Sequence, residues 1–267
     1  MNKEKIAFVL EGESREVQIA NNIEKIFFGS KNDNIEVINL SAGMNIYMLW
    51  EIMQADDFDT DIIEVIREKD EAARKRLDGI DREQFSEVYL FFDYDGHQNN
   101  IKSDNNTDVV MEMLSDFDNE TDQGKLYISY PMIEALRDRV GDDCDINPDC
   151  IISIDAGTQY KNSSSGNKKE SEFTRYDISE WRNAITSFAL RLGCLLDQDK
   201  SPSFKDYQKI NPMDIYKKQL RKYICNGKIF ILSAIPEFLL DYNREPFYYS
   251  MITRQTNKRN SCKKWEA

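Results

Sequence analysis

Five consecutive apolar residues at positions 88–92 run directly into two acidic residues, Asp93 and Asp95. An uninterrupted apolar run of this length is typical of a strand that is buried on both faces. Strands of that kind occur in parallel sheets that are covered by helices on each side. The run therefore predicts an α/β fold in which carboxylates stand at the end of a central strand.

The rest of the first half supports this prediction, because strand-like and helix-like patterns alternate along it. Apolar runs predict strands at residues 5–10, 35–40, 88–92, 126–130 and 150–154. Helical spacing and capping residues predict helices at residues 14–28, 45–54, 61–77, 108–117 and 131–139, the last beginning with Pro131. Alternation of this kind is characteristic of a mainly parallel sheet flanked by helices.

The pattern changes after residues 158–172, a polar segment rich in Ser, Gly and Lys that we interpret as a loop or linker. Beyond it, apolar residues recur every three or four positions from Trp181 to Leu195, which predicts an amphipathic helix. We therefore expect an α/β domain at residues 1–157 and a helical C-terminal region at residues 173–267.

The charge of the chain is unevenly distributed. The net charge is −13, yet residues 205–267 carry 13 Lys and Arg against 6 Asp and Glu, and residues 1–204 carry 22 against 42. An acidic body argues against unspecific nucleic-acid binding, whereas an acidic site beside a basic region suits a polyanion. The basic helix at residues 213–224 supplies four candidate nucleic-acid-binding residues: Lys217, Lys218, Arg221 and Lys222. A solvated helix face is the alternative interpretation of these charges.

Composition argues against several classes of protein. No stretch approaches the ~18 apolar residues of a membrane-spanning helix. The five cysteines include no CxxC pair, which argues against a zinc site or a disulfide framework. The first apolar run is short and ends in acid, so no secretory signal peptide is expected. We expect a cytoplasmic protein with reduced thiols and no membrane contact.

A second acidic strand end stands near the start of the chain, where Glu11 follows the first predicted strand. Ligands of parallel α/β sheets sit beyond the carboxyl ends of the strands. If the two strands are neighbours, Glu11, Asp93 and Asp95 converge there, and their mutual repulsion favours a divalent cation such as Mg²⁺. Gly12 and Gly96 follow these acids and allow a tight turn beside a bulky ligand.

The two segments FVLEGES (residues 8–14) and VYLFFDYDG (residues 88–96) together resemble the Toprim domain. That domain occurs in primases, topoisomerases and the OLD-like and RloB-like nucleases of bacterial phage defence. Its pattern is a Glu-Gly after the first strand and an Asp-x-Asp after a later one. The segment YISYPMIEAL (residues 127–136), which contains Glu134, is similar to defence-associated members. The resemblance covers about residues 1–155.

The resemblance implies a Mg²⁺- or Mn²⁺-dependent endonuclease that hydrolyses phosphodiester bonds of DNA or RNA. Glu11 would act as general acid/base or metal ligand, and Asp93 and Asp95 would hold the metal. Glu16 and Glu134 are further candidate ligands, although acids in first helical turns are also favoured by the helix dipole alone. Whether one or two metals bind is left open.

The resemblance also implies a biological role as the toxic effector of an antiviral, abortive-infection system. Such nucleases work with an ATPase sensor, and this sequence contains no GxxxxGK[ST] motif. We therefore expect an ABC-type ATPase partner protein in addition to the nucleic-acid substrate, and a homodimer is possible.

Two other functions fit parts of the sequence. Asp93 and Asp95 in LFFDYDG also match a haloacid-dehalogenase-type phosphatase, with Asp93 as nucleophile and Asp95 as acid/base. That interpretation leaves Glu11 unexplained, and His97 stands where such phosphatases usually have Thr or Val. A non-catalytic regulatory subunit with a vestigial site is the third hypothesis. The lone His97 is a candidate substrate contact or a plain surface residue.

Overall fold

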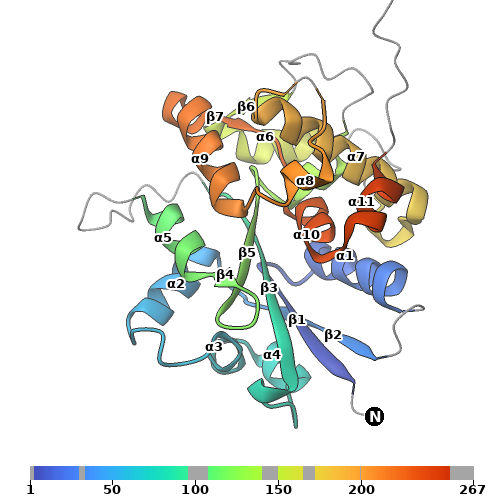
Figure 1. The fold of residues 1–267 in the computed structure, drawn as a ribbon. Helices are drawn as coiled ribbons and strands as arrows, with labels where there is room; N and C mark the ends of the chain where they lie inside the picture. The colour runs from blue at the N-terminus through green and yellow to red at the C-terminus, as the bar shows by residue number, and fades with distance from the viewer. Residues whose placement is uncertain are drawn as a thin grey trace, which may run out of the picture.

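The computed structural model describes residues 3–29, 34–95, 108–139, 150–164, 172–198 and 200–252, and it is mixed α/β (Figure 1). A five-stranded sheet with the order β2-β1-β3-β5-β4 forms its centre. Its strands are β1 (Glu4–Leu10), β2 (Ile35–Ser41), β3 (Phe85–Asp93), β4 (Asp118–Asn119) and β5 (Gly124–Ser129). The pairs β2–β1, β1–β3 and β3–β5 are parallel, and only β4 runs antiparallel to its neighbour. The predicted α/β class with a mainly parallel sheet is confirmed.

The strands β1 and β3 occupy the centre of the sheet because their apolar runs are buried along most of their length. Their register pairs Leu10 with Phe91, so both strands end at the same edge of the sheet. The backbone N–H of Glu11 continues the ladder by donating to the Phe91 carbonyl oxygen at 3.3 Å. The two acidic strand ends are therefore direct neighbours.

Helices cover both faces of the sheet. The connection from β1 to β2 and the connection from β2 back past β1 to β3 run in opposite directions, so right-handed crossovers place their helices on opposite faces. The first crossover contains α1 (Arg15–Ile23) and a π-helical turn (Glu24–Phe28). The later helices are α2 (Ile46–Gln54), α3 (Ile62–Lys69), α4 (Glu71–Arg76) and α5 (Val109–Asp116).

The C-terminal part adds six helices and a small second sheet within the described residues. The helices are α6 (Gly157–Ser163), α7 (Ile178–Leu195), α8 (Phe204–Tyr207), α9 (Pro212–Lys222), α10 (Ala234–Tyr242) and α11 (Glu245–Met251). The strands β6 (Ile151–Ser153) and β7 (Lys228–Phe230) pair antiparallel. In Figure 1 this small sheet and α6 lie beyond the carboxyl end of the central sheet, at the top of the view.

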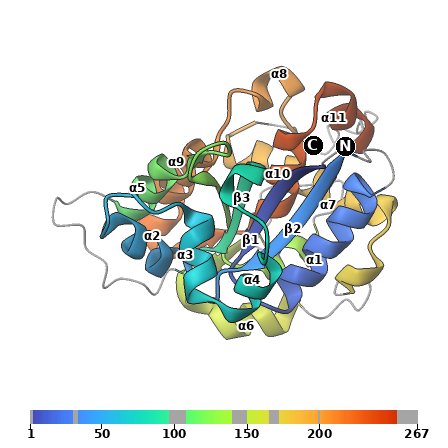
Figure 2. The same cartoon turned by 90° about the horizontal axis from the view of Figure 1, so that it is seen from below.

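One hydrophobic core joins the sheet to the C-terminal helices. The ring of Phe238 on α10 is fully buried, and its centroid lies 5.2 Å from those of Phe8 and Phe91 and 4.7 Å from that of Tyr89. Figure 2 shows α10 on one side of the central strands and α3 and α4 on the other. The division of the chain into domains near residue 157 stays a prediction, but apolar packing continues across it.

Three predicted elements differ from the observed ones. The helix expected at residues 61–77 is interrupted at Asp70, whose carboxylate accepts a hydrogen bond from the Ala73 N–H at 2.6 Å and thereby caps α4. The helix expected at residues 131–139 is a shorter 3₁₀ helix, Ile133–Arg137, and Pro131 precedes it after a cis peptide bond.

The third difference concerns the polar segment at residues 158–172, whose first part was predicted as a loop but forms α6. Tertiary contacts hold this helix in place. The guanidinium of Arg137 donates to the Lys161 carbonyl oxygen at 2.8 Å and to the Ser164 hydroxyl at 3.1 Å, and the Tyr160 ring is buried. Polar composition alone therefore did not reveal the helix.

Over the part of the chain that the structure describes, no helix combines the length and apolarity needed to span a bilayer.

Candidate acidic site at the carboxyl end of the sheet

The structure brings Glu11 and Asp93 into direct contact. The backbone N–H of Asp93 donates a hydrogen bond of 3.0 Å to Oε2 of Glu11, although the two residues are 82 positions apart. The contact follows from the register of β1 and β3, which ends both strands at one edge. Two of the predicted site residues are therefore in contact at the carboxyl end of the sheet.

Burial and like charges raise the pKa values of both carboxyls. The pKa of Glu11 is raised to about 6, first by burial and then by the charges of Glu16 and Asp95, while the hydrogen bond from Asp93 opposes the rise. Burial also raises the pKa of Asp93 well above its ordinary value, and the charges of Glu11, Glu16 and Glu134 add to this effect. All five predicted acids therefore belong to one electrostatic cluster.

Glu16 folds back over the Glu-Gly turn from the first turn of α1. A Cβ atom on Gly12 would lie only 2.7 Å from Oε2 of Glu16, so the absence of a side chain at Gly12 lets this carboxylate approach the backbone. The position of Gly12 directly after Glu11 thus has a structural reason in addition to the turn that it forms.

Glu134 lies in the 3₁₀ helix after β5 and is buried, with its side chain 2% exposed. Its Oε1 accepts a hydrogen bond from Nη1 of Arg15 and lies 3.7 Å from Nζ of Lys161. Among the described residues at this edge of the sheet, Arg15 and Lys161 thus form ion pairs with Glu134 and not with Glu11 or Asp93.

Asp95 follows the end of β3 and is partly exposed. Tyr94, which precedes it, is buried, and its ring lies 5.6 Å from that of Tyr130 and 6.3 Å from that of Tyr216 on α9. The hydroxyl of Tyr216 also donates to the Asp108 carboxylate at 2.8 Å. Aromatic packing thereby connects α9 to the end of β3. The predicted turn residues at positions 96 and 97 lie outside the described residues.

The donor set fits a hard divalent cation in its chemistry, because it consists of clustered carboxylates, and Glu11 and Asp93 form no ion pair with the Lys and Arg residues that the structure describes. Throughout the described ranges, however, no group of three or more Asp, Glu, His or Cys side chains is arranged to hold a metal ion. The residues that would bind Mg²⁺ are therefore gathered at one edge, and a complete set of ligands is not assembled in this conformation.

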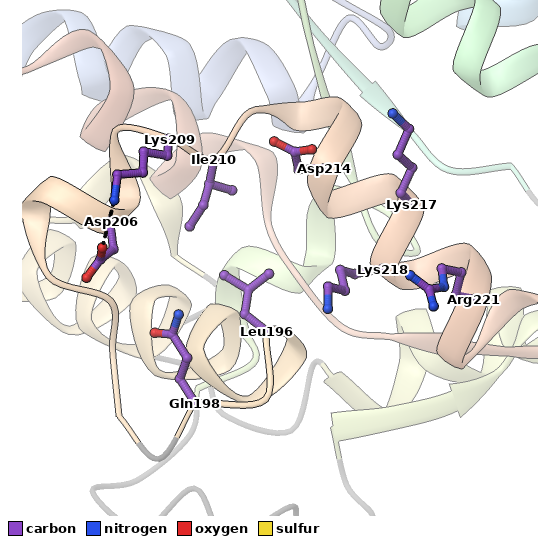
Figure 3. Close-up of a pocket in the computed structure, with 9 residues that line it drawn as sticks. All are labelled: Leu196, Gln198, Asp206, Lys209, Ile210, Asp214, Lys217, Lys218 and Arg221. Atoms are coloured by element: carbon purple, nitrogen blue, oxygen red, sulfur yellow. Dashed lines mark hydrogen bonds and ion pairs between the residues drawn. The ribbon is translucent and has the colours of Figure 1, made fainter.

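The predicted basic residues lie on α9, away from the acidic cluster. Lys217, Lys218 and Arg221 line a pocket of about 470 Å³ together with Asp214 of α9, Asp206 of α8 and residues of the segments that follow α7 and α8 (Figure 3). None of the five acids lines this pocket. Lys222 does not line the pocket; its ammonium group donates to the Leu195 carbonyl oxygen and pairs with Asp197, whose other carboxylate oxygen lies 3.9 Å from Nζ of Lys218.

The pocket is positively charged because four cations, among them Lys209, line it together with only two acids, Asp206 and Asp214. Asp206 accepts from the Ser203 hydroxyl at 2.6 Å and from Nζ of Lys209 at 3.2 Å, as Figure 3 marks for the lysine. Asp214 accepts from the Asn211 N–H in a capping box at the start of α9. The assignment of this surface to nucleic acid stays a prediction.

Two residues of the site, Arg15 and Lys161, were not among the predicted site residues. Arg15 stands four positions after Glu11, and its place in the first turn after the Glu-Gly pair was the available signal. Lys161 lies in the segment predicted as a loop, and nothing in the sequence relates it to Glu134.

No family model, curated protein or solved structure matches the chain.

Proposed function

We propose that the protein is a Toprim-type nuclease that uses Mg²⁺ or Mn²⁺ to hydrolyse phosphodiester bonds of DNA or RNA. The observation that carries the proposal is the contact between Glu11 and the backbone of Asp93 at the ends of two adjacent parallel strands. The order of the two motifs, their strand context and the clustered carboxylates around them support the same chemistry.

In this proposal each residue has a defined task. Asp93 and Asp95 hold the cation, which when bound supplies Lewis-acid chemistry to the phosphodiester. Glu11, fixed by the Asp93 N–H, serves as a further ligand or as the group that transfers a proton. Glu16 approaches the same turn from α1 and is the best placed additional carboxylate.

The basic face of α9 supports a polyanionic substrate. Lys217, Lys218 and Arg221 line a pocket beside α9, the helix that packs through Tyr216 against the end of β3. A nucleic-acid strand that contacts this helix would approach the acidic cluster along the protein surface. The proposal extends to a cytoplasmic antiviral effector that works with an ABC-type ATPase partner.

The phosphatase hypothesis is less well supported by the site. The phosphatase hypothesis gives Glu11 no task, although its carboxylate is in contact with the backbone of Asp93. The Glu11→Ala variant separates the two functions, because it should abolish nuclease activity and spare a phosphatase that uses Asp93.

The decisive experiment incubates the purified chain with plasmid, single-stranded DNA and total RNA in the presence of Mg²⁺ or Mn²⁺. We expect cleavage by the wild type, loss of cleavage in Glu11→Ala and Asp93→Ala, and retention in Glu13→Ala. Glu13 is a matched control because it is exposed and lies in the same segment. Cleavage that survives both site substitutions, or no metal-dependent cleavage of any substrate, would refute the proposal.

A further inference from the structure

Two cations converge on one buried carboxylate oxygen beside the acidic cluster. Both Arg15 and Lys161 pair with Oε1 of Glu134, which is buried, whereas the side chains of Arg15 and Lys161 are 42% and 53% exposed. Glu134 lies in the 3₁₀ helix that follows β5, and Ser129 at the end of β5 is paired with Asp93, so the three charged groups lie next to the strand ends. The arrangement places solvent-facing positive charge against the acidic site.

The two cations come from distant parts of the chain and stand on separate helices. Arg15 is the first residue of α1, four positions after Glu11. Lys161 lies on α6, and its carbonyl oxygen accepts a hydrogen bond of 2.8 Å from the buried guanidinium of Arg137. Arg137 thereby fixes the backbone that carries Lys161, and its own positive charge adds to this side of the site.

The number of charges exceeds what a structural role requires. One cation is enough to neutralise the carboxylate of Glu134, yet Arg15, Lys161 and the nearby Arg137 together supply three. Because Glu134 is buried, its carboxylate needs one counter-charge, and the second cation is not required for that purpose. The solvent-facing parts of Arg15 and Lys161 are therefore able to bind an anion from solution in addition to Glu134.

We propose that Arg15 and Lys161 form a phosphate-binding pair, which receives a backbone phosphate of the nucleic-acid strand beside Glu11 and Asp93. This inference rests on the proposed function, since the substrate is the same polyanion. Glu134 is then a positioning residue that holds both cations in place, rather than a metal ligand. The guanidinium of Arg15 can bind phosphate oxygens through two N–H groups, and Lys161 acts as a point charge.

The acidic cluster explains why such a pair is needed. Glu11, Asp93 and Glu16 create a negative field that repels a phosphodiester, even when part of that charge is neutralised by a cation. A cationic pair on the neighbouring wall divides the site into an acidic half for the metal and a basic half for the phosphate. Arg15 and Lys161 are the two partly exposed cations in contact with Glu134.

The test measures binding separately from cleavage. Binding of a fluorescent single strand of about 20 nucleotides is followed by anisotropy at several salt concentrations, with Ca²⁺ in place of Mg²⁺. We expect Arg15→Gln and Lys161→Gln each to weaken binding about tenfold, as for a lost charge-assisted hydrogen bond. Each should also reduce the slope of log K against log salt by about 0.7, the value for one lost contact to a single strand.

The test includes two control substitutions and a check that each variant is folded. Arg15→Lys retains the charge beside Glu134, so it should fold normally and keep the wild-type salt slope. Lys75→Gln removes a cation from an exposed pair with Glu71 on α4, which Figure 1 shows at the opposite end of the sheet, and should change nothing. Thermal unfolding of each variant verifies that the fold is intact.

The outcomes separate this inference from the proposed function. If Arg15→Gln and Lys161→Gln bind with the affinity and salt slope of the wild type, or the wild type does not bind the strand, the phosphate-binding pair is refuted. If the wild type cleaves and both variants cleave with unchanged KM, the pair is refuted and the nuclease stands. If binding is weakened as expected but Mg²⁺ and Mn²⁺ give no cleavage, the pair stands and the nuclease is refuted.

Discussion

Removal of the charge at Glu11 is expected to stabilise the metal-free protein. The pKa of Glu11 rises from 4.5 to about 6 on folding, so the folded state binds the proton more tightly than the unfolded state does. The rise of about 1.5 units corresponds to about 2 kcal/mol of folding free energy. At neutral pH the charged carboxylate therefore destabilises the fold by about this amount.

The sign of the pH dependence follows from the same shift. Above pH ~6 Glu11 is charged in both states and the full cost is present, whereas below pH ~4.5 it is protonated in both and the cost disappears. Glu11→Gln removes the charge and keeps an oxygen that accepts from the Asp93 N–H. We expect the variant to be more stable than the wild type near pH 8 and equally stable near pH 4.

The measurement is chemical denaturation in the presence of EDTA, over a series of pH values. A gain of about 2 kcal/mol corresponds to a rise in Tm of about 4–8 °C for a protein of this size. Glu13→Gln, an exposed residue of the same segment, should leave the stability unchanged at every pH. A Glu11→Gln variant that is less stable than the wild type at neutral pH, or a difference that does not depend on pH, would contradict the reasoning.

Three other substitutions test the packing around the site. Tyr216→Phe loses the hydrogen bond to Asp108 and should lower the free energy of unfolding by about 1–2 kcal/mol, measured by urea denaturation. Gly193→Ala introduces a Cβ that overlaps with the Lys200 carbonyl oxygen, so we expect a loss of about 1–3 kcal/mol by the same assay, and wild-type stability would contradict the overlap. Phe238→Ala empties the centre of the shared core and should cost about 3–5 kcal/mol; a cost below 1 kcal/mol would show that α10 packs elsewhere.

The strands of the sheet were predictable because burial on both faces leaves a simple signal. The apolar run at residues 88–92 marks the core of β3, and the observed strand is longer, since Phe85 and the residues after it pair with β1. Local patterns do not state which strands are neighbours. The sequence therefore predicted that Glu11 and Asp93 meet only on the condition that their strands are neighbours, and the pairing of β1 with β3 meets that condition.

Helix boundaries were less predictable, because they depend on single hydrogen bonds. The periodicity of residues 61–77 continues through Asp70, yet its carboxylate caps a new helix instead of extending the old one. The helix α6 depends on contacts with Arg137, which no local pattern reveals.

The charged partners of Glu134 show where sequence analysis reaches its limit. Arg15 lies 119 positions away from Glu134, and the two meet only because α1 begins at the same sheet edge where β5 ends. A sequence pattern describes residues within one element or a short connection. Contacts between side chains of different elements require the packed fold.

The position of Phe238 has a consequence for synthesis of the protein. Its ring packs on the face of the sheet that carries Phe8 and Phe91, so a nascent chain lacks these contacts until α10 has left the ribosome. Lys161 and α10 both follow the strand ends in the order of translation. The core on this face of the sheet is therefore complete only once the chain has been synthesised through α10.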